Sequence, residues 1–191
     1  MNPDIQQLKM MAESGDAEAQ FQLATYCHSQ GDYAACTRWL KSACHKQHIR
    51  AMTNLAICYY FGDGVAQSYT EALPLFQKAS TLGDVSAKYY VGLSYLNGNG
   101  VDQDSRKAFK ILYDCADEGM PWAQLSLADC YKDGIGTAVD LFEAVSWYAR
   151  AAEQGVEEAQ KKFQSIYYST HFTDHEGKQR WFWFEREALK R

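Results

Sequence analysis

Residues 87–101 read AKYYVGLSYLNGNGV, and closely related stretches stand 36 residues earlier, at 51–65, and 36 residues later, at 123–137. Each stretch begins with an alanine and ends in a pair of glycines, which are Gly62 and Gly64, Gly98 and Gly100, and Gly134 and Gly136. Self-similarity at a fixed period of about 20–50 residues is typical of repeat arrays. The sequence therefore predicts a row of repeated units.

The register of the repeat is set by the alanines Ala51, Ala87, Ala123 and Ala159, which we take as position zero. Position four is apolar and position eight is tyrosine in every unit: Leu55, Val91, Leu127 and Phe163, then Tyr59, Tyr95, Tyr131 and Tyr167. Apolar residues four positions apart form a stripe on one face of a helix. Small residues at position five, Ala56, Gly92 and Ala128, would let neighbouring helices approach closely.

Each unit is expected to hold a helix A that ends at the first glycine of the pair and a helix B that ends at Gly83, Gly119 or Gly155. Glycine commonly stops a helix because it enters the left-handed region without a Cβ clash. Asp104 and Asp140 are expected to begin helix B, where an aspartate accepts from free backbone N–H groups. Pro74 is expected in the first turn, since an interior proline costs about 3 kcal/mol.

The ends of the array follow the same pattern with changes. The unit that begins at Ala19 has 32 residues, because Gly31 alone replaces the double-glycine loop. Near the other end, Glu176–Arg191 departs from the repeat and is predicted to form a closing helix, with Trp181 to Phe184 covering the end of the stack. Repeat arrays need such caps, because each unit buries its core only against its neighbours.

The AxxxLAxxYxxGxGV stretches and the segment Trp147–Gly155 resemble the Sel1-like repeat family, which is close to the tetratricopeptide repeats. The resemblance implies an all-α fold, a right-handed α-solenoid of antiparallel helix pairs with about 11 helices in one domain over residues 1–191. Its expected parts are a partial repeat at 1–18, repeats at 19–50, 51–86, 87–122 and 123–158, and a C-terminal helix pair or cap at 159–191. The resemblance also implies an adaptor or scaffold without catalysis and without a cofactor.

Composition and charge limit the classes of partner that this protein is expected to bind. A net charge of −5 and a pI near 5.5 argue against nucleic-acid binding, which favours a basic stripe. The sequence contains no apolar run of about 18 residues and no basic start followed by an apolar segment. We therefore expect no membrane insertion and a cytoplasmic location, or a periplasmic one if a leader has been removed.

Six cysteines, Cys27, Cys36, Cys44, Cys58, Cys115 and Cys130, lack the regular eight-residue pairing of the disulfide-stapled relatives. Small buried thiols are the favoured interpretation, with a single Cys115–Cys130 pair as the alternative. His171 and His175 have metal-ligand spacing, but they fall in a connection without a third ligand, so a solvated loop is favoured. His45 and His48 are interpreted as partners of the negative end of a helix B.

The candidate binding face lies opposite the stripe of helix A that positions zero, four and eight form in every repeat. At about 100° per residue, positions two, six and nine fall on that side, and in relatives the A helices line the concave side of the solenoid. The predicted protein-binding residues are Ile57, Tyr60, Tyr89, Leu93, Leu96, Leu125, Asp129 and Lys132, with Tyr90 and Phe61 as further candidates. The alternative is that some of these side chains pack against a neighbouring helix A or the terminal helix.

Two functions remain open. The first is a bacterial adaptor or scaffold that grips another protein or peptide in the groove. The second is an immunity protein that neutralises a cognate secreted toxin or effector, because an acidic face could complement a basic toxin site. An enzyme is disfavoured, since no set of acid, base, nucleophile and oxyanion donors converges in the sequence.

Overall fold

The computed structural model describes residues 5–169, and this part of the chain consists of ten helices and their connections. The first helix, α1, spans Ile5–Glu13, and each later helix has 13 residues. The helices are α2 (Ala17–Ser29), α3 (Tyr33–His45), α4 (Ile49–Phe61), α5 (Tyr69–Thr81), α6 (Val85–Asn97), α7 (Ser105–Asp117), α8 (Pro121–Asp133), α9 (Leu141–Glu153) and α10 (Glu157–Ser169). The prediction of an all-helical array is confirmed.

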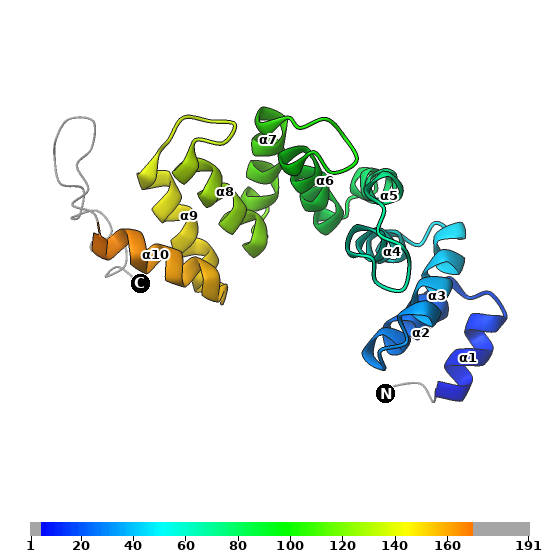
Figure 1. The fold of residues 1–191 in the computed structure, drawn as a ribbon. Helices are drawn as coiled ribbons and strands as arrows, with labels where there is room; N and C mark the ends of the chain where they lie inside the picture. Colours follow the sequence, from blue (N-terminus) through cyan, green and yellow to red (C-terminus); the bar gives the residue numbers. More distant parts are fainter. Residues whose placement is uncertain (1–4, 170–191) are drawn as a thin grey trace.

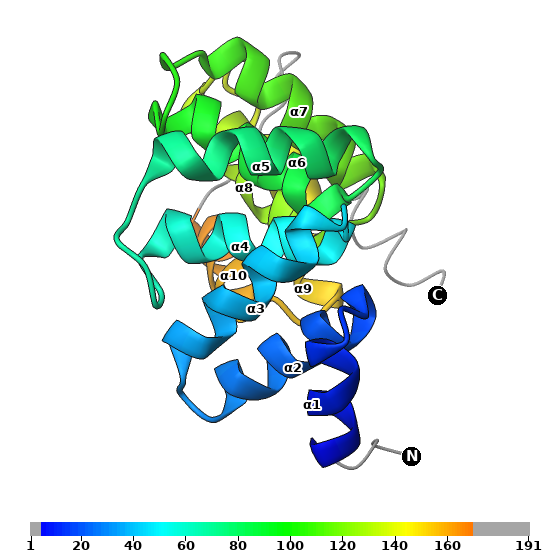
Figure 2. The ribbon, with the colours of Figure 1, turned by 90° about the vertical axis from the view of Figure 1, so that its right-hand side faces the viewer.

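The helices follow one another along a curved row, with α1 and α10 at opposite ends (Figure 1). Figure 2 looks along the row from the end that holds α1, and the later helices stack behind it. The most extensive contacts join helices that are consecutive in sequence. Helices α2, α4, α6, α8 and α10 correspond to helix A of the repeat, and α3, α5, α7 and α9 correspond to helix B. The predicted eleventh helix and the predicted closing segment at 176–191 fall on residues outside the described part of the chain.

The helix starts follow the sequence signals. The carboxylate of Asp104 accepts from the N–H of Lys107 at 3.0 Å, and that of Asp140 accepts from Phe142 and Glu143. The predicted caps of α7 and α9 are therefore confirmed. Aspartate also caps α2, α3 and α6, and Ser68 caps α5. Helix α8 lacks a side-chain cap and begins instead with Pro121, whose missing N–H costs nothing at that position.

The glycines stop the helices as predicted. Gly62, Gly98 and Gly134 adopt left-handed backbone at the ends of α4, α6 and α8, with φ of 85°, 74° and 70°. The second glycine of each pair has positive φ for a further reason. A Cβ atom added to Gly64, Gly100 or Gly136 would lie 2.1–2.6 Å from a backbone oxygen of the preceding helix B. The glycine loop of each repeat therefore packs against the first residue of helix B in the repeat before it.

Two sequence expectations about helix ends are wrong. Pro74 is the sixth residue of α5 and lies beyond its first turn. It deprives the carbonyl of Thr70 of a helical N–H donor, but both residues are exposed, so water can reach that carbonyl. His48 is the N-cap of α4: its Nδ1 accepts from the N–H of Ala51 at 3.1 Å. It therefore serves the start of the next helix A and not the end of a helix B.

The core is a row of small clusters along the array, each shared between neighbouring helices. The alanines at position zero, Ala51, Ala87, Ala123 and Ala159, are fully buried. Gly92 shows why small residues recur: a Cβ there would lie 3.1–3.3 Å from the side chains of Leu112 and Ile111 on α7. The backbone of helix A at Gly92 therefore lies directly against side chains of helix B.

Candidate functional site

Side chains at position two of helix A connect one repeat to the next. The ring of Phe21 stacks on His48 with centroids 4.8 Å apart, Thr53 donates to the Asp84 carboxylate at 2.9 Å, and the hydroxyl of Tyr89 lies 3.2 Å from that of Ser126. Leu125, at the same position, is 6% exposed. Position two therefore faces the neighbouring repeat. An internal helix A packs against a helix on each side, so only a narrow strip of its surface is left exposed to solvent.

Tyr60, predicted to line the groove, belongs to the core. It is 7% exposed, and its ring lies edge-on to the rings of Phe61, Tyr69, Phe76 and Tyr90. Its hydroxyl accepts a hydrogen bond of 2.7 Å from the side-chain amide of Asn99, in the glycine loop of the next repeat. The structure thus places Tyr60 at a junction between repeats.

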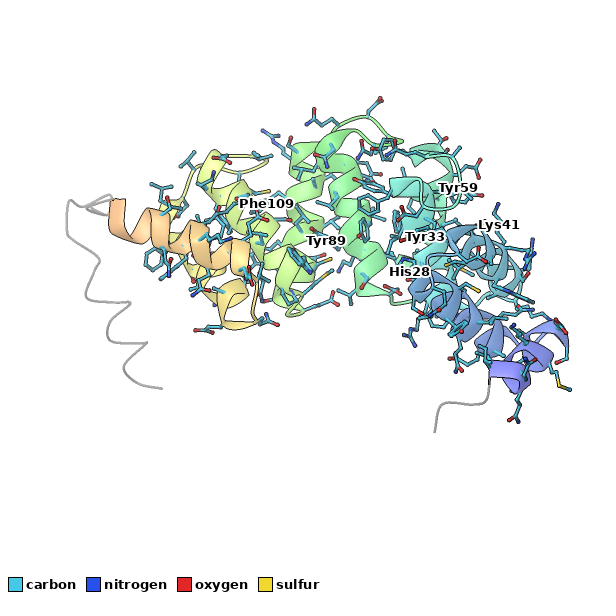
Figure 3. The ribbon with its side chains drawn as sticks, turned by 60° about the horizontal axis from the view of Figure 1, so that its bottom comes forward. His28, Tyr33, Lys41, Tyr59, Tyr89 and Phe109 are labelled. Carbon is cyan, nitrogen blue, oxygen red and sulfur yellow. The ribbon has the colours of Figure 1, made fainter. Side chains whose placement is uncertain are left out.

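The remaining apolar candidates, Ile57, Leu93 and Leu96, are half-buried on α4 and α6. Phe61 is the most accessible aromatic residue beside them: it is 55% exposed while its ring contacts Tyr60 and Tyr90. The helical angle favours Tyr60 over Phe61, because the angle alone does not include Asn99 of the next glycine loop, which contacts position nine. We call Ile57, Phe61, Leu93 and Leu96 the inner strip. Figure 3 shows the side chains along the array and labels Tyr89 on α6.

The charged candidates differ in their surroundings. Asp129 accepts a hydrogen bond of 2.5 Å from the hydroxyl of Tyr148 on α9 and is bonded through both oxygens, at 2.9 and 2.8 Å, to Lys162 on α10. Lys162 also pairs with Glu158 at 2.8 Å. Asp129 therefore joins three helices. Lys132 is half-buried and pairs with its neighbour Asp133 at 3.1 Å.

Three further contacts between adjacent repeats join polar side chains that are 30 residues apart in the sequence. Glu18 contacts His48 at 2.9 Å, Lys88 contacts Glu118 at 2.9 Å, and Gln154 donates to Gln124 at 2.8 Å. The hydrogen bond from His48 is the main cause of the lowered pKa of Glu18. Since His48 Nδ1 accepts from the N–H of Ala51, the other ring nitrogen, Nε2, is the one that donates to Glu18.

All six cysteines carry free thiols, Cys115 and Cys130 included. Burial raises the pKa of Cys44, Cys115 and Cys130 to about 11. These thiols are protonated at neutral pH and are poor nucleophiles. Cys36 and Cys58 line a cavity between the first two helix pairs.

Within residues 5–169, no group of three or more His, Cys, Asp or Glu side chains is arranged to hold a metal ion. His171 and His175 lie outside the described residues. The helices of the described region have at most 13 residues, whereas a bilayer span takes about 20, and none of them could cross a membrane.

Comparison with known proteins agrees with this architecture. The sequence model of the Sel1 repeat matches residues 17–48, 49–84, 85–113 and 123–156. Among solved structures, a Sel1 repeat protein from Oxalobacter formigenes is 32% identical with a TM-score of 0.79, covering 85% of this chain and 66% of that one. A protective antigen of uropathogenic Escherichia coli is 33% identical with a TM-score of 0.78, covering 87% and 36% of the two chains.

Among curated proteins, chitin synthase regulatory factor 2 of Schizosaccharomyces pombe is 30% identical over 177 residues, which cover 83% of this chain and 34% of that protein. The chain spans about a third or less of the length of the first curated relatives it matches. The family match covers four successive helix pairs, from α2 and α3 to α8 and α9, and the two solved relatives share both sequence and fold over most of the chain. The chain belongs to the Sel1 repeat family.

Proposed function

We propose that this protein is a non-catalytic adaptor that binds another protein through the inner strip of α4 and α6. Sel1 repeat proteins generally act as scaffolds for protein interactions, and the similar yeast protein is named a regulatory factor. The observation that carries the proposal is the accessible aromatic ring of Phe61, one helical turn after Ile57 on α4, together with half-buried Leu93 and Leu96 on the next helix A, α6. Accessible aromatic and aliphatic side chains with a polar rim are typical of binding hot spots.

The rim around the strip is polar. Thr25 and His28 are exposed on α2, at one side, and Lys132 is half-buried on α8, at the other. A partner segment laid along the A helices would meet apolar contacts in the middle and polar contacts at both ends. This distribution favours a peptide or helix of several turns over a small molecule.

The test is an affinity capture from an extract of the source organism with three forms of the protein: wild type, Leu93→Asp with Leu96→Asp, and Met10→Asp. Met10 is 70% exposed on α1, far along the row from the strip, so its variant controls for a new charge at an apolar surface site. We expect wild type and Met10→Asp to retain the same partner and the double variant to lose it. Retention by all three forms, with the double variant folded by circular dichroism, would contradict the proposal.

A dedicated inhibitor is the second candidate, supported by the net charge of −5, which suits a basic surface on a toxin. The two roles differ in what the captured partner does. Co-expression separates them: a partner that stops growth alone and not with this protein indicates an immunity protein. A partner that is harmless alone indicates an adaptor.

A further inference from the structure

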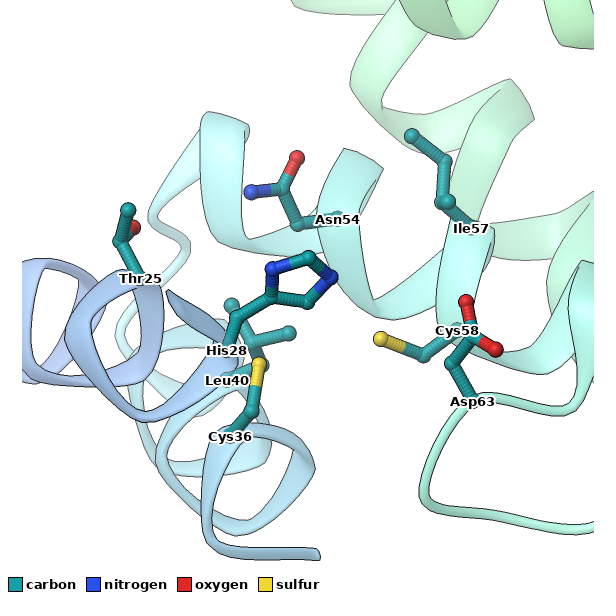
Figure 4. Close-up of a pocket in the computed structure, with 8 residues that line it drawn as sticks. All are labelled: Thr25, His28, Cys36, Leu40, Asn54, Ile57, Cys58 and Asp63. Carbon is teal, nitrogen blue, oxygen red and sulfur yellow. The ribbon is translucent and has the colours of Figure 1, made fainter. Parts of the chain in front are cut away.

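A cavity of about 190 Å³ lies between the first two helix pairs, and Ile57 of the inner strip is one of its lining residues. Figure 4 shows its lining side chains around a common space. They come from three helices and one loop: Thr25, His28, Cys36, Leu40, Asn54, Ile57, Cys58 and Asp63. One water needs only about 10–15 Å³, whereas sites for whole small molecules span about 300–1,000 Å³. The space suits one inserted side chain.

The cavity exists because this junction between repeats is left open. At the next junction, residue nine of helix A, Tyr60, is bonded to Asn99 in the middle of the following glycine loop. The equivalent residues at the first junction are His28 and Asp63, and both line the cavity. No hydrogen bond or ion pair joins their side chains in the described structure; the ring of His28 lies edge-on to Tyr33, with centroids 5.2 Å apart.

The walls combine apolar surface with a free negative charge. Leu40, Cys36 and Cys58 are buried, and Ile57 is half-buried beside them. Asp63 is exposed, and its carboxylate has no hydrogen bond or ion pair among residues 5–169. Asp63 is one of the residues that line the cavity, so its negative charge borders this space.

We propose that this cavity binds a lysine or arginine side chain of the partner protein. The methylene stem would lie against Leu40 and Ile57, and the cationic head would pair with the Asp63 carboxylate. Long basic side chains cover apolar surface with their stems while their charged ends find a polar partner. The net charge of −5 favours the approach of a basic segment. This inference rests on the proposed function and adds the chemistry of one anchor residue in the partner.

The experiment selects short random peptides displayed on phage against the immobilised full-length chain. Dissociation constants of the selected peptides are then measured by fluorescence anisotropy with wild type, Asp63→Asn, Ile57→Trp and Asp102→Asn. Asp63→Asn removes the charge and keeps the shape, and Ile57→Trp fills the cavity. Asp102 is an exposed acid of the next repeat's loop region and provides the matched control.

We expect selected peptides to share a lysine or arginine next to apolar residues. Asp63→Asn and Ile57→Trp should each weaken their binding about tenfold or more, as for the loss of a hydrogen bond to a charged group, and Asp102→Asn should leave it unchanged. Peptides without a basic residue, peptides that bind Asp63→Asn as tightly as wild type, or a selection that enriches nothing would overturn the inference. The double variant Leu93→Asp with Leu96→Asp is measured in the same way. If selected peptides without a basic residue bind it more weakly than wild type, the proposed inner strip stands without the cavity.

Discussion

Gly136 lies so close to Ser105 that a Cβ atom on the glycine would lie 2.1 Å from the serine carbonyl oxygen. Gly64 and Tyr33, and Gly100 and Tyr69, repeat the relationship in the two preceding units. The second glycine of each pair is therefore a contact between repeats, and the first is the helix stop. Both roles require glycine, for different physical reasons.

Replacing Gly136 by alanine should destabilise the protein by at least ~2 kcal/mol, because the Cβ adds a backbone clash to the strain of positive φ. Gly119→Ala is the control: its φ is also positive, at 91°, but nothing lies within 4 Å of an added Cβ. That variant should lose only about 1–2 kcal/mol. Thermal melting followed by circular dichroism compares the two. Equal losses would show that the close approach contributes nothing.

His48→Ala should destabilise the protein by about 1 kcal/mol, because the N–H of Ala51 loses its capping acceptor. His48→Asn should recover most of this loss, since asparagine is a good N-cap residue. His45, exposed in the last turn of α3, provides the control, and His45→Ala should stay within about 0.5 kcal/mol of wild type. A His48→Asn variant no more stable than His48→Ala would argue against the capping role.

How far the sequence predicts the fold can be judged at particular residues. The register, the glycine stops and the caps at Asp104 and Asp140 are local signals, since each depends on backbone geometry within a few residues. Pro74 lies beyond the first turn of α5 because the Ser68 cap sets the start of the helix, four residues before the apolar run begins. The burial of Tyr60 and Leu125 depends on contacts between repeats, which a helical wheel of one helix does not contain.

Tyr60→Ala should cost about 3–5 kcal/mol, as expected for removing a large buried aromatic side chain. Asn99→Ala should cost about 1–3 kcal/mol, since it leaves the buried Tyr60 hydroxyl without its partner. Denaturant unfolding measures both. If Tyr60→Ala is as stable as wild type, Tyr60 is a surface residue and its place in the core is wrong.

Stability should fall at alkaline pH through the cluster around Asp129. Burial, and then the hydrogen bond to Asp129, raise the pKa of Tyr148. Burial opposes the charged form of Lys162, but its hydrogen bonds to Asp129 and Glu158 outweigh burial and raise its pKa. A folded-state pKa above the unfolded value means that both groups stabilise the fold below about pH 10 and that this contribution is lost as the pH rises through the raised values.

The measurement is the melting temperature from about pH 8 to about pH 11. Burial also raises the pKa of Tyr89, Tyr90 and Tyr131, so wild type is compared with Tyr148→Phe and Lys162→Met to isolate the cluster. Each variant should lose less stability than wild type over this interval, because one titrating group is gone. Parallel curves for all three proteins would rule out this cluster as a source of the alkaline loss.

The central claim, that a partner lies along the inner strip of α4 and α6, is tested most directly by amide hydrogen exchange of the protein alone and in complex with the captured partner. Binding at the strip predicts slowed exchange in the C-terminal halves of α4 and α6, around Ile57, Phe61, Leu93 and Leu96, with little change in α5 and α7. Slowed exchange confined to α5 and α7, or to the ends of the array at α1 and α10, would contradict it.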